Sequence, residues 1–247
     1  MGIRSIIKLF KQGNVCVTGL RGTGKDMLIA NVVARRKRPY ISNVDYKAKC
    51  ALRFPLLLPA FDIKNSYDDF IKNDVKPYYY PYPEKTDIYV SDVGVYFPSQ
   101  FCNELNRKYD TFPYFMALSR QLCDSNVHFN VQNLNRAWDK LREQSDIYIR
   151  CERTFVIFGL VFQTVTVYDN YDSCLRRVHP FKPLKKPISL KSQIRSDWDL
   201  KNIELKRAFV ERNGLVRRRL LIYRNKSKYN TRIFKDILEN GKKENNV

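Results

Sequence analysis

A glycine-rich octapeptide near the N-terminus constrains the fold more than any other part of the chain. It consists of Gly19, Leu20, Arg21, Gly22, Thr23, Gly24, Lys25 and Asp26. The β-branched segment 14–18 before it favours a strand, and residues 27–34 after it favour a helix. Glycines between a strand and a helix let the backbone wrap around a phosphate group, and the helix N-terminus attracts its negative charge. The octapeptide therefore predicts a nucleotide-binding phosphate loop, with Lys25 at the β- and γ-phosphates.

The last residue of the octapeptide departs from the usual pattern. Phosphate loops of this form end in G-K-[ST], and the hydroxyl group binds Mg²⁺. Here the position is Asp26. A carboxylate is also an oxygen ligand for Mg²⁺, but it places a negative charge beside the phosphates. Two interpretations stay open: an active site in which Asp26 holds the metal, and a degraded site that binds nucleotide and hydrolyses it poorly.

A second candidate for the same chemistry follows a later strand. Residues 87–92 form a short apolar segment that ends in Asp92. Nucleotide hydrolysis at a phosphate loop needs an acid at such a strand end, to hold Mg²⁺ and orient water. Asp92 stands where this acid is required, although an ordinary strand-end carboxylate would give the same pattern.

Predicted strands and helices alternate along the first two thirds of the chain. The strands are 14–18, 40–44, 87–92, 126–132, 147–149 and 155–168, and the main helices are 27–34, 100–107, 111–122 and 134–141. This alternation predicts a three-layer α/β fold with a mostly parallel sheet and antiparallel strands added at its end. The polar–apolar pattern of 126–132 predicts a strand with one solvent-exposed face. We also expect a short helix at 66–71 and an exposed tyrosine-rich loop at 76–83.

The positive charge is concentrated near the C-terminus. The net charge is +20, and the last 72 residues, with 21 basic and seven acidic side chains, carry +14 of it. Three prolines at 180, 183 and 187 suggest a linker, so we expect a domain at 1–172 and a basic C-terminal tail at 173–247, with helices at 199–211 and 229–240. The candidate nucleic-acid contacts are Arg217, Arg218, Arg219, Arg224, Lys226 and Lys228. Interleaved tyrosines suit stacking on single-stranded bases; an anionic membrane surface or a solvated extension would also fit.

Neither a zinc site nor a membrane span is expected. The six cysteines form no C-x-x-C pair, and the chain has two histidines, so reduced thiols in a cytoplasm are the simpler interpretation. The longest apolar run, residues 155–167, is shorter than the ~20 residues that a transmembrane helix needs.

Several short motifs occur in a characteristic order over roughly residues 13–170. After the octapeptide come Asn43, then Ser91-Asp92 with Phe97-Pro98 beyond, then Ser119-Arg120-Gln121, Gln132 and Arg142. With these motifs the chain resembles the zonular occludens toxin-like family, the assembly ATPases of filamentous phages. That family is similar to the FtsK/HerA class of DNA-pumping ATPases, which are P-loop NTPases.

The resemblance assigns roles to these residues. Registered on Phe97-Pro98, Asp92 falls on a glutamate of the family and Ser91 on an aspartate. Relative to the family, the carboxylate thus lies in the loop, at Asp26, and the hydroxyl lies at the strand end, at Ser91. We expect Asp26, Ser91 and Asp92 at the metal, with Asp92 also orienting water. The resemblance implies a γ-phosphate sensor at Gln132 and arginine fingers at Arg120 and Arg142. A polar strand end and ordinary salt bridges are the alternatives for these three.

The resemblance also implies an ATP- and Mg²⁺-dependent motor that moves DNA during virion assembly. We expect a homo-oligomeric ring acting on DNA, mainly single-stranded, with a membrane-bound or capsid partner. The expected location is the host cytoplasm or the periphery of the inner membrane. Phage-extruding members usually carry a transmembrane helix after the ATPase domain. The lack of one here weakens extrusion and leaves room for soluble packaging or for a separate membrane partner. The alternative is a nucleotide-gated DNA-binding or scaffold protein that does not hydrolyse ATP.

Overall fold

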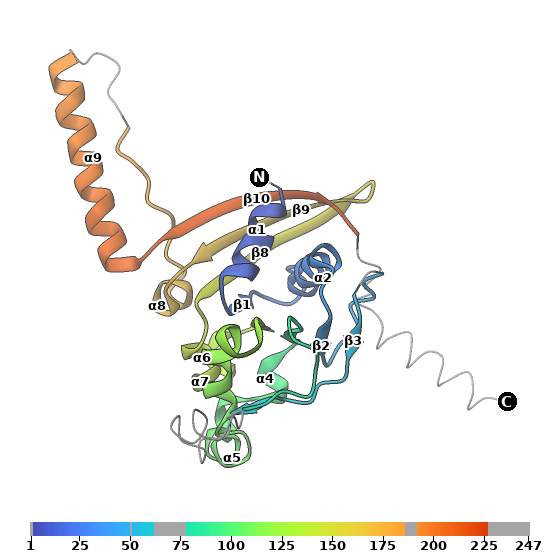
Figure 1. Cartoon of the computed structure of the whole chain (residues 1–247). Coiled ribbons are helices and arrows are strands. Elements are labelled where there is room, and N and C mark those ends of the chain that lie inside the picture. The colour runs from blue at the N-terminus through green and yellow to red at the C-terminus, as the bar shows by residue number, and fades with distance from the viewer. Residues whose placement is uncertain (1, 50, 62–77, 186–191, 227–247) are drawn as a thin grey trace.

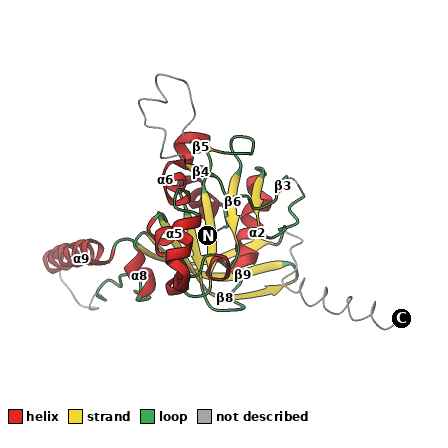
Figure 2. Cartoon of the chain, turned by 90° about the horizontal axis from the view of Figure 1, so that it is seen from below, coloured by secondary structure: helices red, strands yellow, loops and turns green. Residues whose placement is uncertain are grey.

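The computed structural model describes residues 2–49, 51–61, 78–185 and 192–226. An eight-stranded sheet forms the centre, with helices packed on both faces (Figures 1 and 2). Its strands are β1 (Val15–Thr18), β2 (Tyr40–Ser42), β3 (Arg53–Phe54), β6 (Asp87–Val90), β7 (Val127–Val131), β8 (Ile147–Ile157), β9 (Leu160–Tyr168) and β10 (Val216–Arg224). A separate two-stranded sheet pairs β4 (Ala60–Phe61) with β5 (Tyr78–Tyr79).

The strand order in the main sheet is β10-β9-β8-β1-β7-β6-β2-β3. β1 lies between β7 and β8 and runs parallel to both. β6 runs parallel to β7 and β2, whereas β9 and β10 extend the sheet antiparallel to their neighbours. This confirms the expected three-layer α/β fold with a mostly parallel sheet. Since parallel strands end at the same edge, the residues that follow β1, β6 and β7 come together there.

The helices are α1 (Arg4–Gln12), α2 (Lys25–Arg36), α4 (Val93–Tyr96), α5 (Cys102–Lys108), α6 (Phe112–Cys123), α7 (Asp139–Glu143), α8 (Tyr171–Leu175) and α9 (Ser192–Asn213). Alternating side chains of β1 separate two cores. Val15 and Val17 pack with α1 and α2, while Cys16 packs with the core on the opposite face, which includes α6. Because each face of the central strands is covered, β1 is buried along its whole length.

Two local predictions are wrong. β7 has no exposed face, because it lies between β1 and β6 and is buried at every position. Its polar side chains have partners inside the protein: the ring nitrogen Nδ1 of His128 accepts a hydrogen bond from the amide of Val15 at 3.2 Å. The second wrong prediction is the exposed tyrosine-rich loop. Tyr80 of this segment is half-buried and stacks on Phe115, with 5.7 Å between the ring centroids.

Helix α1 was not predicted from the sequence. The spacing of Ile3, Ile6 and Phe10, which are all buried, was the available signal. The helices expected at 66–71 and 229–240 lie outside the described residues.

The arginine-rich part of the C-terminal extension is an edge strand of the main sheet. β10 pairs with β9 over its full length, from Val216 opposite Tyr168 to Arg224 opposite Leu160. The domain boundary at residue 172 stays a prediction, but β10 belongs to the same sheet as the phosphate loop. Pairing with β9 explains why this segment forms a strand, because β9 supplies hydrogen-bond partners for backbone N–H and C=O groups along its whole length.

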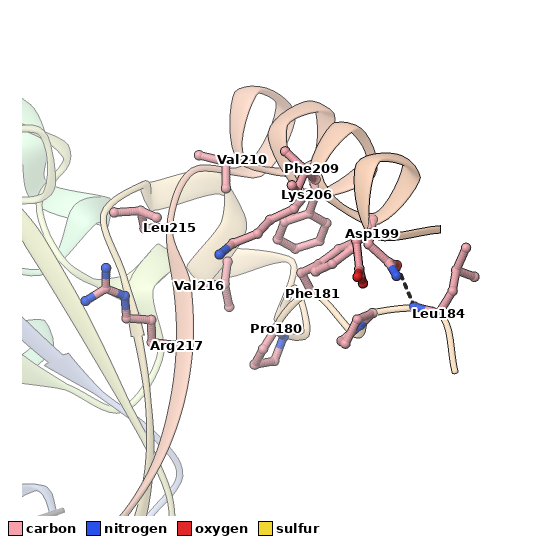
Figure 3. Close-up of a pocket in the computed structure, with 13 residues that line it drawn as sticks. Pro180, Phe181, Leu184, Asp199, Lys206, Phe209, Val210, Leu215, Val216 and Arg217 are labelled. Atoms are coloured by element: carbon pink, nitrogen blue, oxygen red, sulfur yellow. Dashed lines mark hydrogen bonds between the residues drawn. The ribbon is translucent and has the colours of Figure 1, made fainter. Parts of the chain in front are cut away.

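Helix α9 lies beside the main body, beyond α8, in both views (Figures 1 and 2). It faces the segment that contains Pro180, Phe181 and Leu184, across a cavity of about 810 Å³ (Figure 3). Phe181 contacts Phe209 with ring centroids 5.8 Å apart, and the amide of Leu184 donates to Asn202 at 2.8 Å. Among the described helices, none combines the length and apolar character needed to cross a bilayer.

Candidate active site

The octapeptide forms a tight loop between β1 and α2. Gly19 has φ +148° and Gly24 has φ +78°. A Cβ atom at Gly19 would lie 2.4 Å from the carbonyl oxygen of Cys151, and one at Gly24 would lie 2.5 Å from Thr154 Oγ1. Both positions therefore require glycine, because the loop runs directly against β8.

Lys25 is the first residue of α2, and its ammonium group turns back into the loop. Nζ donates to the carbonyl oxygens of Gly19, at 3.0 Å, and of Leu20, at 3.1 Å. The side chain is only 5% exposed. The cation is thus held at the mouth of the loop, where a phosphate group would replace the carbonyl oxygens as its partner.

Asp26 and Ser91 meet across the ends of two elements. Ser91 Oγ donates to Asp26 Oδ1 at 2.8 Å, and Asn130 Nδ2 donates to the same oxygen at 2.6 Å. Asn130 Nδ2 also lies 3.2 Å from Ser91 Oγ. Ser91 is 4% exposed and Asn130 is fully buried, so the three side chains form an ordered polar cluster beside Lys25.

Two asparagines hold the strand end that carries Ser91 and Asp92. Asn43 exchanges two hydrogen bonds with the backbone of Ser91, both of 2.9 Å. Asn130 Oδ1 accepts from the amide of Asp92 at 2.8 Å. Asp92 has φ +49°, a left-handed conformation that is unusual for a residue with a side chain. These contacts fix the backbone in a conformation that positions both side chains.

Sequence reasoning did not single out Asn130. It lies on β7 between two apolar residues, in register with Val17 of β1. A polar side chain in the middle of a central strand, beside the strand that precedes the loop, was the available signal.

Asp92 is half-buried, and its pKa is raised above the usual value for an aspartate. Burial is the largest cause, and the negative charge of Asp26 adds to it. The positive charges of Lys25 and Arg21 act in the opposite direction. Asp92 is therefore electrostatically coupled to the residues of the loop.

The cluster has ligands suited to Mg²⁺. Asp26 and Ser91 offer a carboxylate and a hydroxyl oxygen within 2.8 Å of each other, and Asp92 adds a second carboxylate nearby. The described part of the chain contains no group of three or more His, Cys, Asp or Glu side chains that could hold a metal by itself. This fits Mg²⁺, which usually takes one or two carboxylates and completes its shell with water and substrate phosphates.

A further pair of side chains supports the loop from the sheet. Gln163 Nε2 donates to the carbonyl oxygens of Thr23, at 3.2 Å, and of Gly24, at 3.0 Å. Tyr223 of β10 donates its hydroxyl to Gln163 Oε1 at 2.9 Å. Thr154 Oγ1 donates to the carbonyl oxygen of Thr23 at 2.7 Å. The last strand of the sheet is thus connected through Gln163 to the phosphate loop.

The other predicted residues lie at different distances from the loop. Gln132 is exposed directly after β7, at the same edge of the sheet. Arg120 donates to the carbonyl oxygen of Gln12 at 2.9 Å, before the start of β1 and so at the opposite edge. Arg142 donates to the hydroxyl of Tyr171 and lies over its ring. Within one chain, Arg120 is therefore directed away from the loop, and its role as a finger requires a neighbouring subunit.

A cavity of about 370 Å³ borders the phosphate loop on the side of β8 and β9. It is lined by Leu20, Thr23, Arg150, Cys151, Glu152, Thr166, Tyr168, Arg177, His179 and Arg218. Arg218 forms an ion pair with Glu152, with 2.6 Å between Nη2 and Oε2. This arginine of β10, a candidate nucleic-acid contact, thus already has an anionic partner.

The structure is similar to several solved structures. The N-terminal domain of zonular occludens toxin from Neisseria meningitidis matches with a TM-score of 0.43 and 12% identity, covering 74% of this chain and 97% of that one. The genome packaging NTPase B204 from Sulfolobus turreted icosahedral virus 2 matches with 0.35 and 12%, covering 56% and 73%. ATPases 2 and 3 of EssC from Geobacillus thermodenitrificans match with 0.40 and 12%, covering 82% and 45%.

No protein-family model matches the sequence, and no curated protein is similar to it. The fold is evident from the chain's own topology: a central strand, a glycine loop and a helix, with the parallel strand β7, which carries Asn130, beside β1, and the parallel strand β6, which Asp92 follows, beside β7. The chain therefore has the α/β fold of the P-loop NTPases.

Proposed function

We propose that the chain binds ATP with Mg²⁺ in the loop Gly19–Asp26 and hydrolyses it. One observation carries this proposal: Asp26 of α2 and the consecutive residues Ser91 and Asp92, which follow β6, gather beside Lys25. A carboxylate, a hydroxyl and an ammonium group at a glycine loop are the side chains that nucleotide hydrolysis with Mg²⁺ needs.

Each side chain has a distinct role in the proposed reaction. Lys25 exchanges the carbonyl oxygens of Gly19 and Leu20 for phosphate oxygens when ATP binds. Asp26 and Ser91 would hold Mg²⁺, which neutralises the charge that develops on the phosphates. Asp92 accepts a hydrogen bond from the attacking water and orients it. Asn130 keeps Asp26, Ser91 and the backbone of Asp92 in register.

Phosphate release by the purified chain tests this proposal directly. We expect ATP turnover that needs Mg²⁺ and that Lys25→Ala abolishes, because the lysine is the cation at the loop. Lys37→Ala, at the other end of α2, is the matched control and should leave turnover unchanged. Absence of Mg²⁺-dependent turnover, with and without single-stranded DNA, would contradict hydrolysis.

We further propose that hydrolysis drives DNA movement in virion assembly, by a ring of identical chains. Support comes from the net charge of +20, the arginines of β10 and the motif order shared with phage assembly ATPases. Stimulation of ATP turnover by single-stranded DNA, together with a multiple of the monomer mass in analytical ultracentrifugation, is the expected result. A monomer whose turnover ignores DNA would argue against a motor.

A nucleotide-gated binding protein is the second candidate. The observation in its favour is that Asp26 accepts two hydrogen bonds and Lys25 donates two, all with other groups of the chain. Such a site can bind ATP and fail to turn it over. Equilibrium binding of ATP without phosphate release, combined with ATP-dependent DNA affinity, would select this candidate.

A further inference from the structure

The turn between β8 and β9 carries a cluster of exposed apolar side chains, which we call the hairpin tip. It consists of Phe155, Val156, Ile157, Phe158 and Leu160, whose side chains are between 40% and 101% exposed. The hairpin lies at the end of the sheet opposite α9 (Figure 1). Exposed apolar clusters of this kind usually mark a surface that another molecule covers.

The hairpin tip is apolar on all sides. Val156 and Val161 form a pair that faces one side of the sheet, and the pairs Phe155–Phe162 and Ile157–Leu160 face the other. The rings of Phe155 and Phe162 stack at 5.0 Å, on a face that leaves Phe155 about half exposed. A protein partner on one face would leave the other face of the tip in water.

Phe158 occupies the turn itself, with its side chain fully exposed. Its φ is +48° and that of Gly159 is +74°. Two-residue turns with positive φ at both positions strongly prefer Asn-Gly or Asp-Gly, and a bulky side chain is unfavourable there. The sequence thus places a large apolar ring at the outermost point of the hairpin, against the local backbone preference.

Three basic residues lie near the hairpin tip: Arg153 on β8, Arg224 on β10 and Lys226 just after it. The one acidic residue of β8, Glu152, is ion-paired with Arg218. Arg224 is paired with Leu160 in the ladder, and the amide of Asn225 donates to Gly159 at 3.0 Å. Arg153 lies two residues before Phe155. Cations therefore lie next to the apolar residues.

We propose that the hairpin tip inserts into the surface of an anionic lipid bilayer. Lipid covers all sides of the tip at once, which the two apolar faces and the apolar turn require. Each arginine held near an anionic surface strengthens binding by roughly fivefold. An apolar wedge with a cationic margin matches this chemistry, because the ring enters the acyl region while the arginines contact the headgroups.

Vesicle flotation with the full chain tests the proposal. We expect binding to vesicles of phosphatidylcholine mixed with phosphatidylglycerol, and weak binding to phosphatidylcholine alone. Phe158→Asp should lower the partition coefficient by about tenfold or more, because a carboxylate replaces the inserted ring. Aspartate tolerates positive φ better than phenylalanine, so this variant is expected to fold.

The matched control is Leu200→Asp on α9, which removes an exposed apolar side chain and adds the same charge far from the hairpin tip. It should bind vesicles nearly as well as the parent. A second measurement uses Phe158→Trp, whose added fluorescence should be quenched by brominated lipid.

Three results would overturn the proposal. The parent could fail to bind anionic vesicles, or Phe158→Asp could bind them as the parent does. Alternatively, Phe158→Asp could reduce the oligomer mass while vesicle binding stays unchanged, which would assign the tip to a contact between copies of the chain. ATP turnover of the tip variant in solution is an independent readout, so failure here is distinguishable from failure of the proposed ATPase.

Discussion

At the scale of single residues, the site depends on an exchange of two side chains. A carboxylate, Asp26, stands where phosphate loops carry a hydroxyl, and a hydroxyl, Ser91, stands at a strand end that suits a carboxylate. The two are in direct contact at 2.8 Å. Because the two side chains are in contact, the proposed Mg²⁺ site still has one carboxylate and one hydroxyl ligand, although each comes from the position where the other is usual.

Reversing the exchange tests this explanation. Asp26→Ala should abolish ATP turnover, since it removes the charged ligand, and Ser91→Asp alone should impair it, because two carboxylates then crowd one ion. The double variant Asp26→Ser/Ser91→Asp should recover much of the activity lost in the single variants. Steady-state phosphate release for the four proteins gives the coupling between the two positions. Additive losses in the double variant would contradict an exchanged pair.

The acidic side of the pH–rate profile depends on Asp92. Its carboxylate must be ionised to orient water, and its raised pKa means that protonation occurs at higher pH than for a free aspartate. Turnover should therefore fall as the pH drops through this raised pKa. Arg21→Gln removes a charge that lowers the pKa, so the acidic limb should move to higher pH. The exposed Arg4→Gln, on α1, should leave the profile unchanged.

Residue patterns predicted the loop and Asp92, but they missed the asparagine that connects them. The loop is visible because its chemistry lies within eight consecutive residues. Asn130 acts through contacts with residues 104 and 39 positions away in the sequence, which only the register of β7 beside β1 brings together.

At the scale of elements, the phosphate loop is supported by the antiparallel half of the sheet. Gln163 of β9 is fully buried and bridges the loop to Tyr223 of β10. Asn31 of α2 also contacts the end of β10, accepting from the amide of Lys226 at 2.9 Å. The helix after the loop and the loop itself are thus both attached to the same edge strand.

Removing this bridge should loosen the loop. Gln163→Leu removes one donor from each of two loop carbonyl groups and takes away the acceptor of the buried Tyr223 hydroxyl, so we expect a loss of roughly 1–3 kcal/mol in the free energy of unfolding. ATP affinity should fall as well. Tyr223→Phe removes one hydrogen bond while Gln163 still holds the loop, so its effect should be smaller. Denaturant unfolding and nucleotide titration measure the two effects, and equal losses for both variants would contradict the bridge.

The alternating pattern of strands and helices predicted the parallel core, and its failures have physical causes. The periodicity of residues 126–132 suggested one wet face, but polar side chains in β7 find partners inside the sheet. The sequence predicts a basic tail where β10 lies, because the three consecutive arginines 217–219 interrupt the apolar pattern of the residues that follow. An edge strand can form without a continuous apolar face if it pairs with a long neighbouring strand, and β9 is such a neighbour for β10.

At the scale of the whole molecule, four arginines line one edge of the sheet. The arginines predicted for DNA binding lie on β10, beside the antiparallel strands and not in a separate tail. Arg217, Arg218 and Arg219 are all exposed, and Arg218 in addition forms an ion pair with Glu152. A strand presents such side chains at fixed spacing, which suits a phosphate backbone.

These environments predict unequal contributions to DNA affinity. Arg217→Gln and Arg219→Gln should each weaken binding of single-stranded DNA and reduce the slope of log affinity against log salt by roughly 0.7. Arg218→Gln should do less, since its guanidinium already contacts a carboxylate. Fluorescence anisotropy at several salt concentrations measures both quantities. If the three variants behave alike, or none changes the slope, β10 does not contact the DNA backbone.

The position of β10 at the end of the sheet has a consequence for the nascent chain. The phosphate loop is translated early, yet the hydrogen bonds that join α2 to Asn225 and Lys226 span 194 and 195 residues of sequence. Contacts of such long range form late in folding. A ribosome must therefore deliver the polypeptide as far as Lys226 before the loop acquires its outer support. A chain synthesised only up to α2 or β9 is thus expected to be a poor consumer of the ATP in the cell.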